Sequence, residues 1–278
     1  MSEVRESSAP LFERSSEPHE AGLLAVNAIG LSTIVIKEFR RVLRIWVQTI
    51  IPPAITMTLY FIIFGSLIGR RIGDMNGVPY TTFIAPGLIM MAVITNSFGN
   101  VVSSFFSGKL QLHLEEMLVS PLSMVTIVLG YVLGGVFRGV LVAALVTVVA
   151  LFFTDLRVTH PFITLSVILL TAMVFSLAGL LNAMFAKNFD DISIVPTFVL
   201  TPLTYLGGVF FSITLLSETW QRIALFNPIL YMVNAFRFGM IGTSDISIGN
   251  AFVIILGLLI VLFVTTIMLL QRGIGVRT

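Results

Sequence analysis

The sequence contains no cysteine and little charge: Asp, Glu, Lys and Arg make up 11% of its 278 residues. A soluble domain carries about 25% charged residues, so a soluble fold of this length would lack the polar side chains to cover its surface. The absence of cysteine excludes disulfides, thiolate nucleophiles and cysteine-ligated metals. The three histidines, His19, His113 and His160, are scattered without metal-ligand spacing, so we expect no metal site.

The sequence consists mainly of long apolar runs, and hydrophobic residues make up 56% of the chain. These runs extend for about 20 residues instead of alternating over about ten, which favours membrane-spanning helices over a β-barrel. We therefore predict an all-α integral membrane protein with a membrane domain at residues 31–278. The polar residues 1–30 are predicted to form a disordered cytoplasmic tail. The six predicted spans lie at about residues 47–68, 82–106, 124–153, 162–186, 192–213 and 250–271.

A further apolar segment, residues 223–241, is expected not to cross the membrane. Asn227 and Pro228 interrupt it early, and Asn234 and Arg237 lie in its second half. The pieces on either side of the break are too short to cross about 30 Å of hydrocarbon. We predict that residues 214–241 form a broken, re-entrant or interfacial helical hairpin before the last span.

The basic residues predict that both termini are cytoplasmic, because Lys and Arg concentrate on the cytoplasmic side of membrane proteins. With the N-terminus inside, the larger group of basic residues falls inside: Arg5, Arg14, Lys37, Arg40, Arg41, Arg44, Lys109, Lys187, Arg272 and Arg277. The smaller group falls outside: Arg70, Arg71, Arg157, Arg222 and Arg237. The pair Arg70 and Arg71 argues against this orientation.

The segment before the first span predicts an amphipathic interfacial helix. Lys37, Arg40, Arg41 and Arg44 follow the i, i+3, i+4, i+7 spacing that places them on one face of a helix. Such a helix would lie flat on the cytoplasmic leaflet. It is either a simple membrane anchor or an anchor whose basic face also touches a cytoplasmic partner.

The loop after the second span, residues 107–121, predicts a short amphipathic helix with an acidic centre at Glu115 and Glu116. Such a helix suits docking into a groove of another protein. A solvated loop helix is the alternative. After the fourth span, Asp190 and Asp191 are expected to cap the fifth.

Arg138 lies in the middle of the third predicted span. An unpaired cation there costs on the order of 3 kcal/mol, so it must face water, a partner or an interface. It could serve as a gate, a subunit contact or a site for a substrate headgroup. Alternatively, it could form a structural pair with a carbonyl or with Asn96, Asn100 or Asn182.

No energy source is visible in the chain. The predicted spans carry no central Asp or Glu, which an ion-coupled carrier uses as its relay, and the phosphate-binding pattern G-x-x-x-x-G-K-[ST] is absent. No catalytic constellation gathers at one membrane level, although Arg70, Arg71 and Asp74 lie close together in a loop. We expect no enzymatic activity in the chain itself, and any pump must be driven by a partner. An ion-coupled secondary transporter remains the alternative, and composition alone leaves a membrane enzyme or a scaffold open.

The C-terminal half carries a family resemblance. The stretch PLTYLGGVFFS at residues 202–212 is followed by Trp220 and by FNPILYMVNAFR at residues 226–237. Together with the basic helix, the six spans and the acidic loop helix, it resembles the ABC-2 type permeases of ABC exporters. The stretch DDISIVPTFVLTPLTY at residues 190–205 is similar to YadH-like bacterial inner-membrane permeases. The resemblance covers about residues 30–278.

This resemblance implies an exporter of an amphipathic, lipid-like or glycan-type substrate, or a drug, in the bacterial inner membrane. Two permease chains would pair with two copies of a separate ABC ATPase and with membrane lipids, and no nucleic acid partner is implied. ATP and Mg would bind the ATPase, so no cofactor is expected in this chain.

The resemblance also implies roles for particular residues, none of them catalytic. Coupling to the ATPase would involve Lys37, Arg41, Lys109, His113, Glu115 and Glu116. An external hairpin that helps to close the exit would contain Asn227, Pro228, Tyr231 and Arg237. A path between two protomers, walled by the second and fifth spans, would include Asn96, Phe98, Asn100, Arg138, Thr201, Thr204 and Tyr205.

Overall fold

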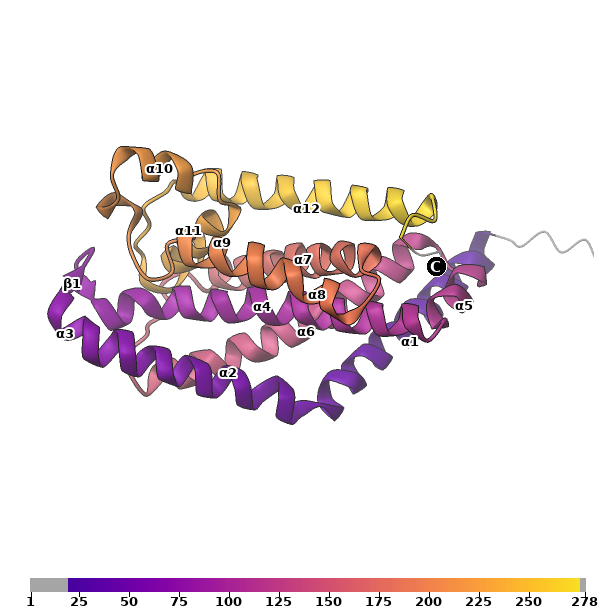
Figure 1. Cartoon of the computed structure of the whole chain (residues 1–278), viewed down its shortest axis with the longest axis horizontal. Coiled ribbons are helices and arrows are strands. Elements are labelled where there is room, and N and C mark those ends of the chain that lie inside the picture. Colours follow the sequence, from indigo (N-terminus) through magenta and orange to yellow (C-terminus); the bar gives the residue numbers. More distant parts are fainter. Residues whose placement is uncertain (1–19, 276–278) are drawn as a thin grey trace, which may run out of the picture.

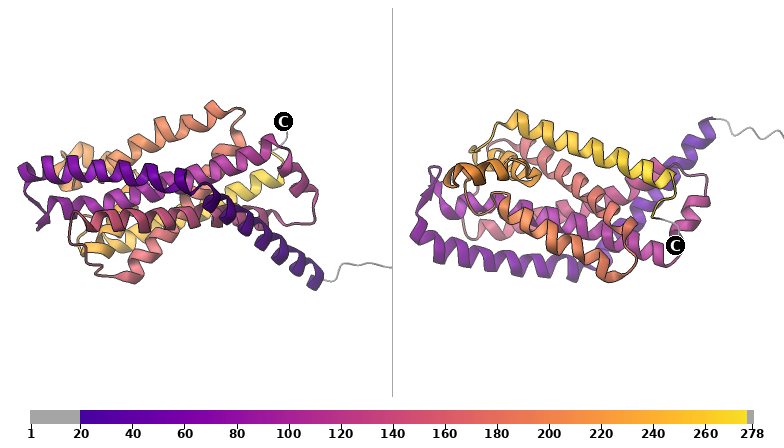
Figure 2. Two further views of the ribbon diagram at one scale, coloured as in Figure 1. Left: turned by 90° about the horizontal axis from the view of Figure 1, so that it is seen from below. Right: turned by 45° about the horizontal axis from the view of Figure 1, so that its top comes forward.

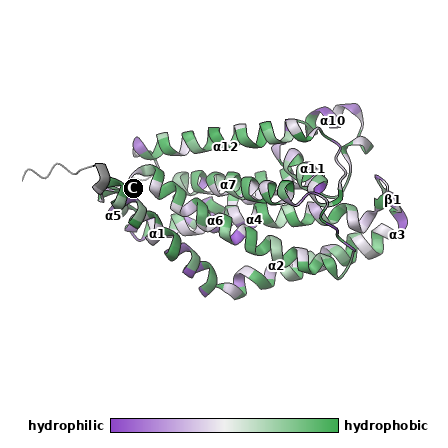
Figure 3. Cartoon of the chain, turned by 180° about the vertical axis from the view of Figure 1, so that it is seen from behind, coloured by the Kyte–Doolittle hydropathy of each residue, from purple (hydrophilic) through white to green (hydrophobic). Residues whose placement is uncertain are grey.

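The computed structural model describes residues 20–275, which are built almost entirely of helices (Figure 1). The long helices run side by side along the long axis, and hydrophobic residues cover most of their length (Figure 3). Hydrophilic residues gather at the ends, for example around α3 and α10 (Figure 3). The prediction of an all-α membrane protein is confirmed.

Six helices in residues 20–275 are long and apolar enough to cross a membrane. Five of them match predicted spans. The first is a continuous helix, Trp46–Ile72, formed by α2 (Trp46–Tyr60), the π-helix η1 (Phe61–Ile68) and α3 (Gly69–Ile72). The other four are α4 (Tyr80–Leu110), α6 (Met124–Leu151), α7 (Pro161–Phe185) and α12 (Ile248–Gln271).

The sixth such helix is α1 (Glu20–Arg44), which was predicted to lie at the membrane surface. It runs obliquely to the bundle and extends beyond it at one end (Figure 2). Ile34 and Glu38 pack over Gly130 and Gly134 of α6, where a larger side chain would clash. Because residues 20–30 are helical, the predicted disordered tail does not reach residue 30, and residues 1–19 lie outside the described residues.

The fifth predicted span is shorter than expected. It consists of α8 (Phe189–Val195), the π-helix η2 (Pro196–Leu200) and α9 (Thr201–Leu206), and it does not continue to residue 213. Gly207 and Gly208 end it, and Gly208 adopts a φ of +73°, which glycine accommodates without strain. The following residues form a turn and a short 3-10 helix, η3 (Ile213–Leu215).

The predicted break within residues 214–241 is confirmed. α10 (Glu218–Ala224) and α11 (Pro228–Ile241) meet at an angle of 90°. The Asn227 side chain accepts a hydrogen bond from the Ile229 backbone N–H at 3.0 Å, and Pro228 occupies the first turn, where no N–H partner is needed. The sequence Asn-Pro therefore starts a new helix at the point where the direction changes.

The connections gather at two opposite ends of the bundle (Figure 1). One end holds α5 (His113–Val119), and the described chain begins and ends there. The other end holds α10 and a two-stranded hairpin of β1 (Asp74–Met75) and β2 (Val78–Pro79). Asn76 and Gly77, both with positive φ, form the tight turn between these strands.

α4 lies at the centre of the bundle and is the most deeply buried of the six long apolar helices in residues 20–275. Small residues let neighbouring helices approach it closely. A Cβ atom added at Gly179 of α7 would lie 2.6 Å from the Phe98 carbonyl oxygen of α4. This close backbone approach is typical of helix packing in membranes, where association depends on van der Waals contact.

Candidate functional site

The α5 end of the bundle presents the predicted coupling helix. Leu112, with a φ of +61°, breaks the chain between α4 and α5, so α5 leaves the direction of α4. Leu114 is buried against the bundle, whereas His113, Glu115 and Glu116 are exposed. The short helix is thus anchored by an apolar side chain and offers acidic groups outward.

Lys109 and Arg41, both predicted to contact a partner, are bonded within the chain. The Lys109 ammonium donates to the carbonyl oxygens of Met184 and Ala186 at 2.9 and 3.0 Å. These carbonyls lie at the C-terminus of α7, where cations stabilise the exposed backbone acceptors. Lys109 therefore fixes α4 to α7, whereas Lys37 is exposed on α1.

Of the acidic pair after α7, Asp191 caps the next helix together with Asn188. The Asn188 side chain accepts from the Asp191 N–H at 2.8 Å, and the Asp191 carboxylate accepts from the backbone N–H of Asn188 at 3.3 Å. This reciprocal arrangement is a capping box. It places the start of α8 beside the Lys109 contact.

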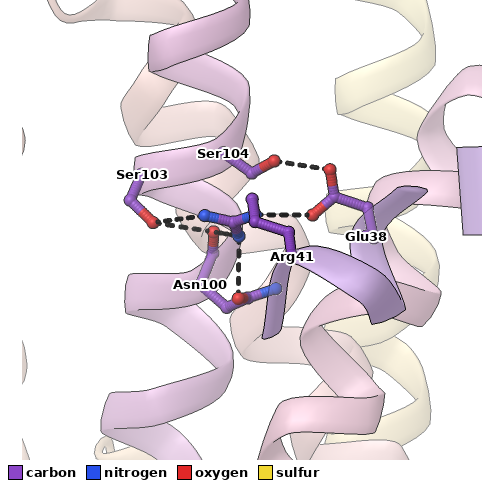
Figure 4. A network of polar contacts seen from close by, with 5 residues as sticks. All are labelled: Glu38, Arg41, Asn100, Ser103 and Ser104. Atoms are coloured by element: carbon purple, nitrogen blue, oxygen red, sulfur yellow. Dashed lines mark hydrogen bonds and ion pairs between the residues drawn. The ribbon is translucent and has the colours of Figure 1, made fainter. Parts of the chain in front are cut away.

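A polar network inside the bundle joins α1 to α4 (Figure 4). The Arg41 guanidinium donates to the backbone carbonyl and side-chain oxygens of Asn100, both at 2.8 Å, and to the Ser103 hydroxyl at 3.3 Å. It also pairs with the Glu38 carboxylate at 3.3 Å, and that carboxylate accepts from the Ser104 hydroxyl at 2.6 Å. Glu38 is fully buried, so the charge pair and its hydrogen bonds keep its carboxylate from being isolated in an apolar environment.

Sequence reasoning missed Glu38, although a signal was present. Glu38 precedes Arg41 by three residues and is the one acid within a basic stripe. The spacing indicates a pair on one helix face. What the spacing does not reveal is that this face turns toward α4, because that depends on how α1 packs across Gly130 and Gly134.

Arg138 lies midway along α6 and lines a cavity of about 270 Å³ between α2, α4 and α6. Asn96 lines the same cavity, so these two predicted path residues are brought together. Within residues 20–275, Arg138 forms no hydrogen bond or ion pair, and its Nε atom is buried. The three asparagines considered as structural partners bond elsewhere: Asn96 to Ala92, Asn100 to Arg41 and Asn182 to Ile192.

The remaining predicted path residues do not share one surface. Phe98, Asn100 and Thr204 are buried within the chain, whereas Thr201 and Tyr205 are exposed on α9. The Tyr205 hydroxyl is 2.9 Å from the Tyr60 hydroxyl of α2, which joins α9 to the first span. The buried three would reach a surface of the bundle only after the helices rearranged.

At the opposite end, Arg237 fixes the broken hairpin to the bundle. Its side chain is fully buried and donates to the Gly208 carbonyl at 2.6 Å and to the Phe83 carbonyl at 3.3 Å. Its guanidinium also lies 3.9 Å from the centre of the Phe83 ring, within the range of a cation–π contact. Arg237 therefore connects α11 to α4 and to the turn after α9.

Asn227 and Tyr231 complete this attachment. The Asn227 amide donates to the Leu203 carbonyl at 2.6 Å, and the Tyr231 hydroxyl donates to the Leu225 carbonyl at 2.9 Å. Asn227 also borders an apolar cavity of about 510 Å³, which Trp220 and Phe226 line as well. The hairpin is thus held at its break and borders an open apolar space.

Asp245 is a second residue that sequence reasoning missed. Its carboxylate accepts from the Asn76 side chain at 3.0 Å and from the Ile213 N–H at 3.1 Å. Its own N–H donates to the Asn234 side chain at 3.0 Å. Three other segments therefore meet at this one residue, and no local pattern around Asp245 indicates it.

Comparison with known proteins identifies the family. A family model described as ABC-2 type transporter matches residues 30–241, which include α2, α4 to α9, the hairpin and most of α1. The chain belongs to the ABC-2 type transporter family. Members of this family generally work with an ABC ATPase partner, and this chain is an ABC transporter permease.

Relatives of this permease support the same assignment. The inner membrane transport permease YadH of Escherichia coli strain K12 is 54% identical over 251 residues, which cover 90% of this chain and 98% of YadH. Nodulation protein J of Rhizobium leguminosarum bv. viciae is 26% identical over 215 residues, covering 77% of this chain and 83% of the relative. With its apolar helices, the permease is a multi-pass protein of the inner membrane.

Proposed function

We propose that this permease is the membrane-spanning subunit of an exporter in which two copies pair and two copies of a separate ABC ATPase supply the energy. The substrate would be amphipathic, lipid-like or glycan-type, or a drug, carried across the bacterial inner membrane. Both termini and α5 would lie in the cytoplasm, and ATP and Mg would bind the ATPase.

The observation that carries this proposal is the construction of α5. Its acidic face is exposed and Leu114 is buried, while Lys109, at the end of the preceding helix, bonds α4 to the end of α7. A push on α5 would therefore move two central helices together. α1 would lie beside it as a connecting helix in the cytoplasmic leaflet, with Lys37 and Arg40 toward the lipid headgroups.

Transport would then follow from a shift between two conformations. ATP binding would close the ATPase dimer and move the two α5 helices, which would favour the outward-open state of the permease dimer. The hairpin held by Arg237 and Asn227 would close the exit in the resting state. The path between protomers would be walled by α4 and by the helix formed by α8, η2 and α9.

Charge reversal of α5 tests this proposal. The double variant Glu115→Lys, Glu116→Lys should abolish the stimulated ATPase activity of the reconstituted complex, because the docking surface would carry the opposite charge. The permease should still elute as a dimer, because both side chains are exposed. Arg71→Glu, a charge reversal at the opposite end, is the matched control and should leave the stimulation unchanged. Full stimulation in the double variant would contradict the coupling role of α5.

A further inference from the structure

The uncompensated charge of Arg138 points to a ligand. A cation inside a membrane helix is costly unless it is paired or hydrated. The nearby charge of Arg41 is of the same sign and already engaged by Glu38 and Asn100. Within the described part of the chain, no side chain or carbonyl forms a hydrogen bond or an ion pair with Arg138. The fold thus maintains a fixed positive charge in the bundle without an internal counter-charge.

The cavity beside Arg138 combines polar and apolar walls. Its polar side chains come from α2 and α4: Gln48, Thr56, Thr95 and Asn96. Its apolar wall is formed by Pro52, Pro53, Met57, Met91 and Ala92. A volume of about 270 Å³ suits an acidic group and the first carbons of a chain, with the rest of the molecule extending through the open side.

Hydrogen-bonding capacity remains free around this cation. The Gln48 amide and the Thr56 hydroxyl form no side-chain hydrogen bond with any described residue. Asn96 uses one of its two amide protons on the Ala92 carbonyl and retains the other. Several neutral donors therefore surround a guanidinium, whose planar fork matches a carboxylate or phosphate.

Other interpretations of the cavity fit less well. A cationic ligand would meet repulsion from Arg138, and no carboxylate lines the cavity to attract it. A proton relay is excluded because an arginine side chain stays protonated. A purely structural cation would be bonded to the carbonyls or asparagines around it, and no such bond is present among residues 20–275.

We propose that Arg138 and the cavity between α2, α4 and α6 bind the acidic group, a phosphate or a carboxylate, of an anionic amphiphile that the permease transports. The acid group would accept charge-assisted hydrogen bonds from Arg138 and further bonds from Gln48 and Thr56. The apolar chain would lie along the proline and methionine wall. This inference rests on the proposed function, because it names the class of substrate for that transport.

Direct binding to the purified full-length permease in dodecyl maltoside tests the inference. The probe is tritiated dodecyl phosphate, measured by equilibrium binding, with dodecanol and inorganic phosphate as competitors. We expect saturable binding of about one probe per protomer, competition by neither dodecanol nor inorganic phosphate at equal concentration, and roughly tenfold or greater loss of affinity in Arg138→Gln. Arg138→Lys should bind with intermediate affinity, and Arg71→Gln, an exposed arginine at the far end, should bind like the wild type.

Several results would overturn the inference. Equal binding by wild type and Arg138→Gln, or equal competition by dodecanol, would show an apolar site that ignores the charge. Competition by inorganic phosphate alone would show a free-anion site. Lipid extraction and mass spectrometry would reveal a resident phospholipid; if dodecyl phosphate could not displace it, the site would be structural.

Controls distinguish a loss of binding from a loss of folding, and they distinguish a failure of this inference from a failure of the proposed function. Size-exclusion elution and melting temperature show whether each variant is folded, and the Arg138→Lys comparison remains decisive if Arg138→Gln fails to fold. Binding is measured without an ATPase, so a missing ATPase would contradict only the proposed function. Absent anion binding in a permease that recruits its ATPase would contradict only this inference.

Discussion

Glu38 and Arg41 show how one polar contact determines where a helix lies. Arg41 satisfies acceptors on α4 and compensates the buried Glu38 carboxylate, so α1 is joined to the centre of the bundle by charge as well as by packing. Removal of one partner from such a pair leaves an isolated charge, which costs more than the pair itself is worth.

We therefore predict that Arg41→Gln destabilises the permease by about 3 kcal/mol. The double variant Glu38→Gln, Arg41→Gln should recover part of this loss, because no buried charge remains. Thermal melting in detergent measures both, with Arg40→Gln on the exposed face of α1 as the control. Equal melting temperatures for Arg41→Gln and the wild type would mean that the network contributes nothing to stability.

At the scale of elements, glycine decides how closely α7 approaches α4. Gly179→Ala places a methyl group 2.6 Å from the Phe98 carbonyl oxygen, so the helices must separate. We expect a loss of about 1–3 kcal/mol, as for other overpacked cores. Gly257→Ala on α12, where no atom lies within 4 Å of the added Cβ, is the matched control. It should be neutral or slightly stabilising by melting temperature; identical losses for both variants would contradict the packing argument.

Arg237 is the fully buried side chain that joins the hairpin of α10 and α11 to α4 and to the turn after α9. Arg237→Met should remove the side-chain donor from the Gly208 and Phe83 carbonyls and cost about 2 kcal/mol or more. Hydrogen–deuterium exchange should rise across α11 and the turn at residues 207–212. Arg222→Met on the exposed face of α10 should leave exchange unchanged. Unaltered exchange in Arg237→Met would show that apolar packing alone holds the hairpin.

The elements also show what local sequence can and cannot predict. Apolar run length located five helices correctly, and Asn227-Pro228 indicated the broken hairpin. The predicted fifth span extended too far because the apolar run continues past Gly207, whereas the helix ends at Leu206, close to Gly208, which Arg237 binds. The run could not show this, because the deciding contact comes from a residue about thirty positions away.

The same limit applies to the candidate site. Composition identified Arg138 as an unusual cation, and the acidic loop marked α5. Other contacts depend on how the helices and loops pack. These are the hydrogen bond of Arg41 to Asn100, the hydrogen bonds at Asp245 and the hydrogen bond of Lys109 to the end of α7. Residue types in the sequence therefore indicated which segments carry unusual charged side chains. Only the tertiary structure shows which of these side chains are already hydrogen-bonded within the chain.

At the scale of the whole molecule, the permease has two differently built ends. One end carries an exposed acidic helix attached to the central helices, and the other carries a hairpin held by a buried arginine. Between the two ends lies the cavity that Arg138 lines, between α2, α4 and α6. In the proposed function, the first end would couple to the ATPase, the cavity would bind the substrate and the second end would close the exit.

Affinity purification of the tagged permease from native bacterial membranes in mild detergent, followed by mass spectrometry, tests this account most directly. The account predicts that an ATPase with the pattern G-x-x-x-x-G-K-[ST] co-elutes in a one-to-one ratio with the permease. Its recovery should fall sharply in the double variant Glu115→Lys, Glu116→Lys. A homo-oligomer without any ATPase, reproduced after chemical crosslinking in the membrane, would contradict the account and favour an ion-coupled carrier.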